Sequence, residues 1–262
     1  MSSLMALIIV LAILMTIVGG ETGIRSFFSV LINGFLLLLA SLLIAWGANI
    51  IIIILIFVPL KLVTIIFLGT HDYTVAKSSF FASCVVCLVT SLIVIVMEHF
   101  SQAYGLGPEA GELLVGLSQM PGLNYAQIGI AVALFSTLGA VAEAAVAMSS
   151  GLLELKKAHP KIDEHALMKA GNEIGYDVLG TAMNTVLFGV FGSFLTLFLW
   201  YFRLNYSFGQ MINDKMFVIE MQIMLYSLIG ILMTVPLSTW TIAKGLSRKD
   251  KLNASKQATS KE

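Results

Sequence analysis

Long apolar runs govern what this chain can fold into. The longest extends from Phe27 to Leu68 and is interrupted by the residues Trp-Gly-Ala-Asn at 46–49. A helix of about 20 apolar residues crosses the hydrocarbon core of a bilayer, so this run is long enough for two crossings. Only 11% of the 262 residues are charged, whereas an ordinary soluble domain has about 25%. The sequence therefore predicts an integral membrane protein and excludes a soluble domain.

The apolar runs predict an all-α fold, a polytopic transmembrane helix bundle of about seven spans, with six as the alternative. In chain order, we expect the spans at residues 3–19, 27–45, 49–68, 78–97, 126–150, 178–200 and 217–240. The first run is short, and without it the number of spans falls to six. Residues 1–243 would form a single transmembrane domain, followed at 244–262 by a basic tail that we expect to be disordered.

Lysine and arginine are unevenly distributed between the connections, and this predicts the orientation of the spans. The tail carries six of them, and the connection between the fifth and sixth spans carries four. Residues 98–127 contain three glutamates and neither Lys nor Arg. We therefore expect the tail in the cytoplasm and the N-terminus outside. Residues 1–20 have no Lys or Arg before the apolar run, so we interpret them as a retained span rather than a secretory signal.

The segment from Gly105 to Tyr125 is a long connection on the expected outer side, with two prolines and several glycines. Its middle, GELLVGLSQM at 111–120, is mostly apolar. An apolar stretch of this length predicts a short interfacial or re-entrant helix rather than a full span.

One carboxylate stands inside an apolar helix. Glu143 lies in the fifth span, and helical spacing places Ser136, Ala147, Ser150 and Glu154 on the same face. A charge in the membrane interior costs at least about 2.5–3.5 kcal/mol, so we expect this face to point into the bundle. Intramembrane carboxylates usually mark ion or proton paths, and we predict that role for Glu143.

The sixth span begins with a second polar stripe. Glu173, Asp177, Thr181 and Asn184 follow at spacings of four, four and three residues, which places them on one helical face. Because the two spans are consecutive, we expect the stripes to face each other and to line a cavity open toward the cytoplasm. The alternative for Ser150, Thr181 and Asn184 is a structural role, in which such side chains form interhelical hydrogen bonds worth about 1 kcal/mol each.

Two cysteines, Cys84 and Cys87, lie in an apolar run. Their CxxC spacing is typical of redox and metal sites, but further metal ligands are missing nearby. We therefore interpret both as small apolar side chains one helical turn apart, and we expect no cofactor and no metal site. The connection after Pro160 has the spacing of an amphipathic helix, with Asp163 as its expected N-cap.

Two blocks in the C-terminal half resemble the YibE/F-like family of bacterial multi-span membrane proteins. The first is LGAVAEAAVAMSSGLLEL at 138–155, and the more specific second is KAGNEIGYDVLGTAMNT at 169–185. The family pattern has Asp more often at position 143 and Ser at position 170, where this chain has Glu and Ala. The resemblance implies a permease-like protein of the bacterial inner or plasma membrane. Because the family has long and short forms, it also implies a second YibE/F-like subunit or self-association.

These features together predict a permease or secondary-transporter subunit with an intramembrane carboxylate site. Its ion or solute path would be lined by Glu143, Ser150, Glu173, Asp177, Thr181 and Asn184. The alternative is a non-transporting structural subunit of a heteromeric complex with a longer relative. The chain has no GxxxxGKS or GxxxxGKT motif and no HExxH motif, and we do not expect an enzyme. The expected partners are the lipid bilayer, a second membrane subunit and a small solute or ion, with no nucleic acid.

Overall fold

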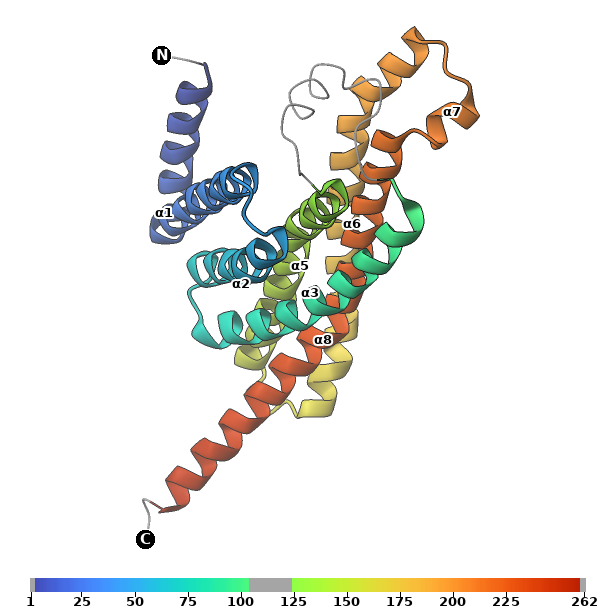
Figure 1. The fold of residues 1–262 in the computed structure, drawn as a ribbon. Helices are drawn as coiled ribbons and strands as arrows, with labels where there is room; N and C mark the ends of the chain where they lie inside the picture. The colour runs from blue at the N-terminus through green and yellow to red at the C-terminus, as the bar shows by residue number, and fades with distance from the viewer. Residues whose placement is uncertain (1–2, 104–123, 260–262) are drawn as a thin grey trace.

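The fold is a bundle of long helices (Figure 1). The computed structural model describes residues 3–103 and 124–259, with side chains up to residue 248. Within these residues, six helices are long and apolar enough to cross a membrane. They are α1 (Ser3–Ala45), α2 (Ile50–Gly69), α3 (Tyr73–Ser101), α5 (Tyr125–Ala158), α6 (Glu164–Arg203) and α8 (Lys215–Thr259), with the short α7 (Phe208–Ile212) before α8. The predicted all-α class is confirmed, whereas the helix expected at 111–120 lies outside the described residues.

Polar residues in the short connections begin four of the helices. The side chains of Asn49, Asp72, Asn124 and Asp163 each accept a hydrogen bond from a backbone N–H in the first turn of α2, α3, α5 and α6. These bonds satisfy donors that a helix N-terminus leaves open. The N-cap predicted at Asp163 is confirmed, and the amphipathic segment after Pro160 forms the first turns of α6.

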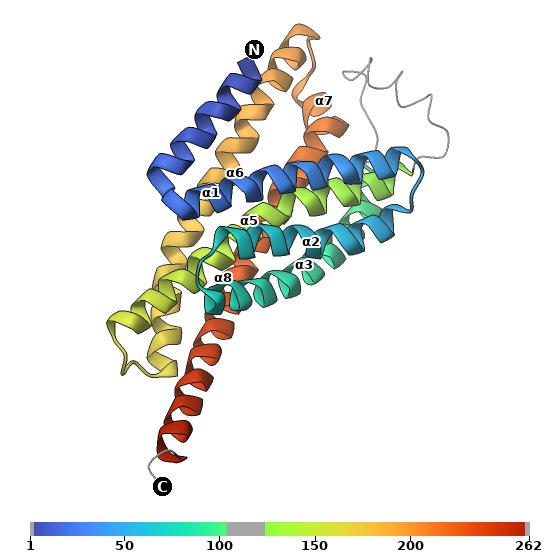
Figure 2. The same cartoon turned by 90° about the vertical axis from the view of Figure 1, so that its left-hand side faces the viewer.

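Helix α1 folds back on itself at Gly20. This residue has φ 54° and ψ −133°, a conformation that glycine adopts more readily than other residues. Gly23 packs against the backbone carbonyl of Met15, which leaves no room for a Cβ. The two limbs diverge from this turn (Figure 2) and correspond to the first two expected spans. No residue of the first limb, 3–19, is buried.

Helices α5 and α8 form the centre of the bundle. Helix α5 contacts α2, α3, α6 and α8, and α8 also contacts α3 and α6. Leu138 and Val141 of α5 pack in one apolar cluster with Leu62 of α2 and Val86 of α3. The inner side of α5 is rich in alanine, and small side chains let neighbouring membrane helices approach closely.

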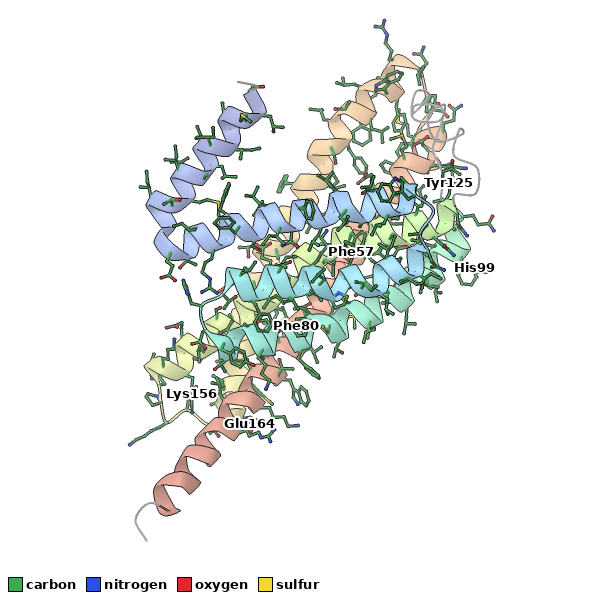
Figure 3. The ribbon with its side chains drawn as sticks, turned by 60° about the vertical axis from the view of Figure 1, so that its left-hand side comes forward. Phe57, Phe80, His99, Tyr125, Lys156 and Glu164 are labelled. Atoms are coloured by element: carbon green, nitrogen blue, oxygen red, sulfur yellow. The ribbon has the colours of Figure 1, made fainter. Side chains whose placement is uncertain are left out.

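The ends of the helices gather at two opposite ends of the molecule. At one end, Lys157 of α5 forms an ion pair with Asp72, which precedes α3, at 3.7 Å. Figure 3 shows Lys156 at this end, and His99 and Tyr125 at the opposite one. We refer to the first as the charged end.

Helix α8 extends beyond the bundle (Figure 1). It continues to Thr259, through most of the segment 244–262 that we expected to be disordered. After Gly245 the sequence contains neither Gly nor Pro, and Lys, Ala and Gln are favourable helix formers. The sequence of the tail is therefore compatible with a continuation of α8, and its expected disorder stays a prediction.

Candidate functional site

Glu143 lies on the outer side of α5. Its side chain is exposed, and Ser150 on the same side is half-buried. Val141, Ala145 and Met148 on the opposite side are fully buried. Helix α5 packs through its alanine-rich side, so Glu143 points away from the bundle of a single chain. The expectation that it points inward is wrong for this single chain.

The four predicted residues of α6, Glu173, Asp177, Thr181 and Asn184, are also exposed. The Thr181 hydroxyl donates a hydrogen bond to the backbone carbonyl of Asp177 at 3.0 Å. The Thr181 hydroxyl is therefore hydrogen-bonded within its own helix. Among the described residues it forms no interhelical hydrogen bond, which was the structural alternative for this residue.

Helix α6 packs on α8 through small residues rather than through its polar stripe. Gly171 lies against Thr239 and Gly175 against Val235 of α8, so closely that neither position has room for a Cβ. The spacing of these glycines is the GxxxG pattern that brings membrane helices together. The polar stripe is consequently turned away from α8. The prediction that the two stripes face each other across an internal cavity is wrong.

The two stripes instead share one outer surface. Both helices pack on α8 with the sides opposite to their stripes, so the stripes flank the α5–α6 contact on the surface away from α8. Gly151 lies against Ile174, and Ala144 packs in one cluster with Ala182. This antiparallel register places Glu143 near the depth of Thr181 and Asn184. We call the six predicted residues the polar face: Glu143, Ser150, Glu173, Asp177, Thr181 and Asn184.

The charges of the polar face are all negative. Glu143, Glu173 and Asp177 have no ion-pair partner among the described residues. Hydrocarbon solvates carboxylates poorly. Such carboxylates are costly in a membrane unless they are protonated or lie beside a polar surface or a cation.

Toward the charged end, the polar face adjoins a cavity of about 420 Å³. Ser150 lines it, together with Asp72, Glu154 and Lys157. The Lys157 ammonium donates to Glu154 at 2.8 Å and lies 3.7 Å from Asp72. Among the six predicted site residues, Ser150 is therefore the one that lines a cavity together with ion-paired side chains.

Lys61 of α2 is a buried charge that was not among the predicted site residues. Its side chain is 7% exposed, and its Nζ lies 4.9 Å from the centroid of the Phe135 ring of α5. No acidic side chain forms an ion pair with it among the described residues. The signal in the sequence is a single lysine inside the apolar run 49–68. An ionisable residue within a span is a candidate functional residue by default.

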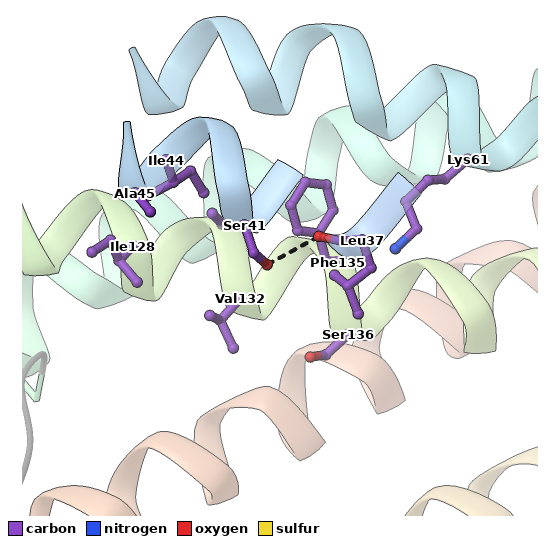
Figure 4. A pocket seen from close by; sticks show the side chains of 10 residues that line it. Leu37, Ser41, Ile44, Ala45, Lys61, Ile128, Val132, Phe135 and Ser136 are labelled. Atoms are coloured by element: carbon purple, nitrogen blue, oxygen red, sulfur yellow. Dashed lines mark hydrogen bonds between the residues drawn. The ribbon is translucent and has the colours of Figure 1, made fainter. Parts of the chain in front are cut away.

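A cavity of about 600 Å³ lies beside Lys61, between α1, α2 and α5 (Figure 4). Its lining is apolar apart from Lys61 and two serines, Ser41 and Ser136. The Ser41 hydroxyl donates to the backbone carbonyl of Leu37 at 2.9 Å. The cavity thus combines one positive charge with an apolar wall.

The two cysteines of α3 are free thiols. Cys87 belongs to an apolar cluster with Leu62 and Leu138, and Cys84 packs against that cluster. Both therefore pack as apolar side chains, as the sequence predicted. Over the described residues, no group of three His, Cys, Asp or Glu side chains could hold a metal ion.

Comparison with known proteins gives a match over most of the chain. A protein-family model, described as YibE/F-like protein, matches residues 7–248. No curated protein and no solved structure matches the sequence. The matched region contains both the polar face and the cavity beside Lys61.

Proposed function

The chain belongs to the YibE/F-like family of multi-span membrane proteins, and we propose that it is one subunit of a permease whose ion path follows the polar face. One observation carries the proposal: carboxylates are exposed on two apolar helices whose opposite sides are packed. A charge facing lipid in the membrane interior costs at least about 2.5–3.5 kcal/mol. A second subunit on this surface removes the contact with lipid and encloses a polar path.

The second subunit in this proposal is another copy of the chain. The α5 part of the surface carries the small exposed residues Gly139 and Ala147, which allow a second helix to approach closely. In a symmetric pair the same surface meets itself, so Glu143 approaches Glu143 of the partner subunit. Two facing carboxylates are stabilised by a shared proton or cation, and such a site can take up and release an ion.

Each residue of the polar face has a role in this path. Glu143 binds the ion in the membrane interior, and Thr181 and Asn184 supply neutral oxygen atoms at a similar depth. Asp177, Glu173 and Ser150 continue the path toward the charged end. We assign the charged end to the cytoplasm of a bacterial cell, because basic connections are retained on that side.

A non-transporting structural subunit is the second candidate. The same exposed carboxylates favour it, because a longer family member covering the polar face would also shield them from lipid. The two candidates differ in one respect: only the permease needs an ionisable group at position 143 after assembly.

Glu143→Gln tests the permease role. Glutamine keeps the size and hydrogen bonding of the side chain but cannot carry its charge. We expect proton or Na⁺ flux to fall by about tenfold or more, while Glu143→Asp retains part of it. Flux is measured in proteoliposomes with a trapped pH-sensitive dye or with radioactive Na⁺. Glu154→Gln, on the same side of α5 but hydrogen-bonded to Lys157, is the matched control and should leave flux unchanged. Full flux in the Glu143→Gln protein at normal abundance would contradict the permease role.

Cysteine crosslinking tests the second copy. In a chain with Cys84 and Cys87 replaced by alanine, Ala147→Cys should form a disulfide between copies under mild oxidation. Leu55→Cys, 74% exposed on α2 and outside the polar face, should not. If Ala147→Cys stays monomeric while Glu143→Gln still abolishes flux, the path remains supported and the symmetric pair is wrong.

A further inference from the structure

The cavity beside Lys61 presents an uncompensated positive charge. Lys61 is the only charged residue among those that line it. An ammonium has three N–H donors, and the Phe135 ring covers one side of it at 4.9 Å. Figure 4 shows the Lys61 nitrogen directed into the cavity. A buried charge without a partner of opposite sign is costly, so the site favours an anionic ligand.

A neutral donor also lines the cavity. Ser136 follows Phe135 on α5 and lines the same cavity. The Ser41 hydroxyl bonds to Leu37, whereas Ser136 is an exposed residue. One ammonium and one hydroxyl suit a head group with a single negative charge and two acceptor oxygens, such as a carboxylate.

The rest of the wall is apolar and extended. From Ile128 to Ser136, α5 rises by about 12 Å along the cavity, and Val132 lies between them. Leu37 and Ile44 of α1 form the facing wall. A small inorganic anion would leave this wall uncovered. The volume of about 600 Å³ lies in the range of sites for small organic ligands, which suits one hydrocarbon chain.

We propose that this cavity binds a single-chain organic monoanion, with its carboxylate at Lys61 and its chain along the apolar wall. Phe135 holds the ammonium from one side, and the ligand head supplies the missing negative charge. The site goes beyond the ion path, because it lies between α1, α2 and α5 and contains none of the polar-face residues. It concerns binding alone and does not depend on transport through that face.

Calorimetric titration of sodium octanoate tests the site. The full chain is placed in nanodiscs of phosphatidylcholine, and the heat from empty nanodiscs is subtracted. We expect saturable binding of octanoate and at least about tenfold weaker binding of neutral 1-octanol, because only the anion pairs with Lys61. Equal affinity for the two probes would overturn the proposal.

Two variants locate the binding. Lys61→Met should weaken octanoate binding at least about tenfold, whereas Lys77→Met, which removes an exposed lysine of α3, should leave it unchanged. Val132→Trp fills the apolar wall with Lys61 still present and should also abolish binding, which keeps the test decisive if Lys61→Met fails to fold. Unchanged binding in either cavity variant would overturn the proposal. Competition by phosphatidylglycerol, with octanoate binding lost in nanodiscs containing it, would assign the site to a phospholipid head group instead.

Discussion

Single buried polar residues differ in whether their hydrogen bonds are satisfied. Thr137 and Thr234 donate to carbonyls of their own helices. Within the described residues, Glu98 Oε2, Gln222 Oε1 and the Tyr226 hydroxyl have no hydrogen-bond partner. Buried polar atoms in proteins nearly always have a hydrogen-bond partner, so these exceptions need an explanation.

The described residues hold seven such groups, and these three lie at neighbouring positions of α3 and α8. Val94 packs with Tyr226 in one apolar cluster, and these helices are antiparallel. The next turn of each helix therefore brings Glu98 to the level of Gln222. A carboxylate that is 4% exposed thus stands between two helices, with no ion-pair partner among the described residues.

Glu98→Gln should stabilise the protein in alkaline solution. Glutamine removes a desolvated charge, so we expect the free energy of unfolding to rise by about 1–3 kcal/mol. The gain should shrink as the pH is lowered, because the wild-type carboxyl takes up a proton and becomes neutral like the amide. Thermal unfolding in detergent measures both effects. Glu220→Gln, at a half-buried position of α8, should show neither, and a Glu98→Gln protein that is less stable at every pH would contradict the interpretation.

At the scale of helices, close packing of glycine joins α6 to α8. A Cβ placed on Gly171 would lie 2.9 Å from Thr239 Oγ1 and 3.2 Å from Thr239 Cβ. The threonine cannot easily turn away, because its hydroxyl donates to the Val235 carbonyl at 2.8 Å. Gly171→Ala should therefore lower the free energy of unfolding by about 1–3 kcal/mol, as overpacking does.

Gly180→Ala is the matched control for this change. It lies on the same helix, and an added Cβ meets nothing within 4 Å. Alanine is the better helix former by about 1 kcal/mol, so this variant should be as stable as the wild type or slightly more stable. Equal unfolding temperatures for Gly171→Ala and Gly180→Ala would show that the glycine contact does not hold α6 on α8.

The sequence predicts which segments are helices better than which sides of them pack. Runs of apolar residues locate the spans, and Asp163 marks the start of α6, because length and capping are local properties. Helix α6 has two candidate packing sides, however: the polar stripe with Asp177 and the small-residue side with Gly171 and Gly175. The structure packs the small side, because small residues let membrane helices approach closely enough for extensive van der Waals contact. Lys61 was overlooked because one lysine barely changes the hydropathy of a long apolar run.

At the scale of the whole molecule, connections far apart in the sequence meet at the charged end. Arg25 donates to His71 Nδ1 at 3.3 Å and to the Phe67 carbonyl at 3.4 Å. The turn of α1 thus lies beside the connection between α2 and α3, where Asp72 pairs with Lys157 of α5. Basic residues near span ends are retained in the cytoplasm. The arrangement therefore supports a cytoplasmic charged end.

Labelling of single cysteines with a membrane-impermeant maleimide tests this orientation. In a chain lacking Cys84 and Cys87, Ala48→Cys and Gly209→Cys lie away from the charged end and should react in intact cells. Ala158→Cys, at the charged end, should react only after permeabilisation. The opposite pattern would invert the assignment, and reaction of all three in intact cells would contradict it.

The first limb of α1 decides between seven spans and six, and Ser3→Cys tests it in the same background. Residues 3–19 rise by about 25 Å as a helix, against a hydrocarbon core of about 30 Å. All but Ser3, Thr16 and Gly19 are apolar, and none is buried.

Because the chain reverses at Gly20 beside Arg25, a limb that crosses would carry Ser3 to the side opposite the charged end. We expect Ser3→Cys to react in intact cells, which gives seven spans, since slight bilayer thinning costs less than leaving this apolar surface in water. If Ser3→Cys reacts with the maleimide only after permeabilisation, the chain has six spans and the limb lies along the cytoplasmic side of the membrane.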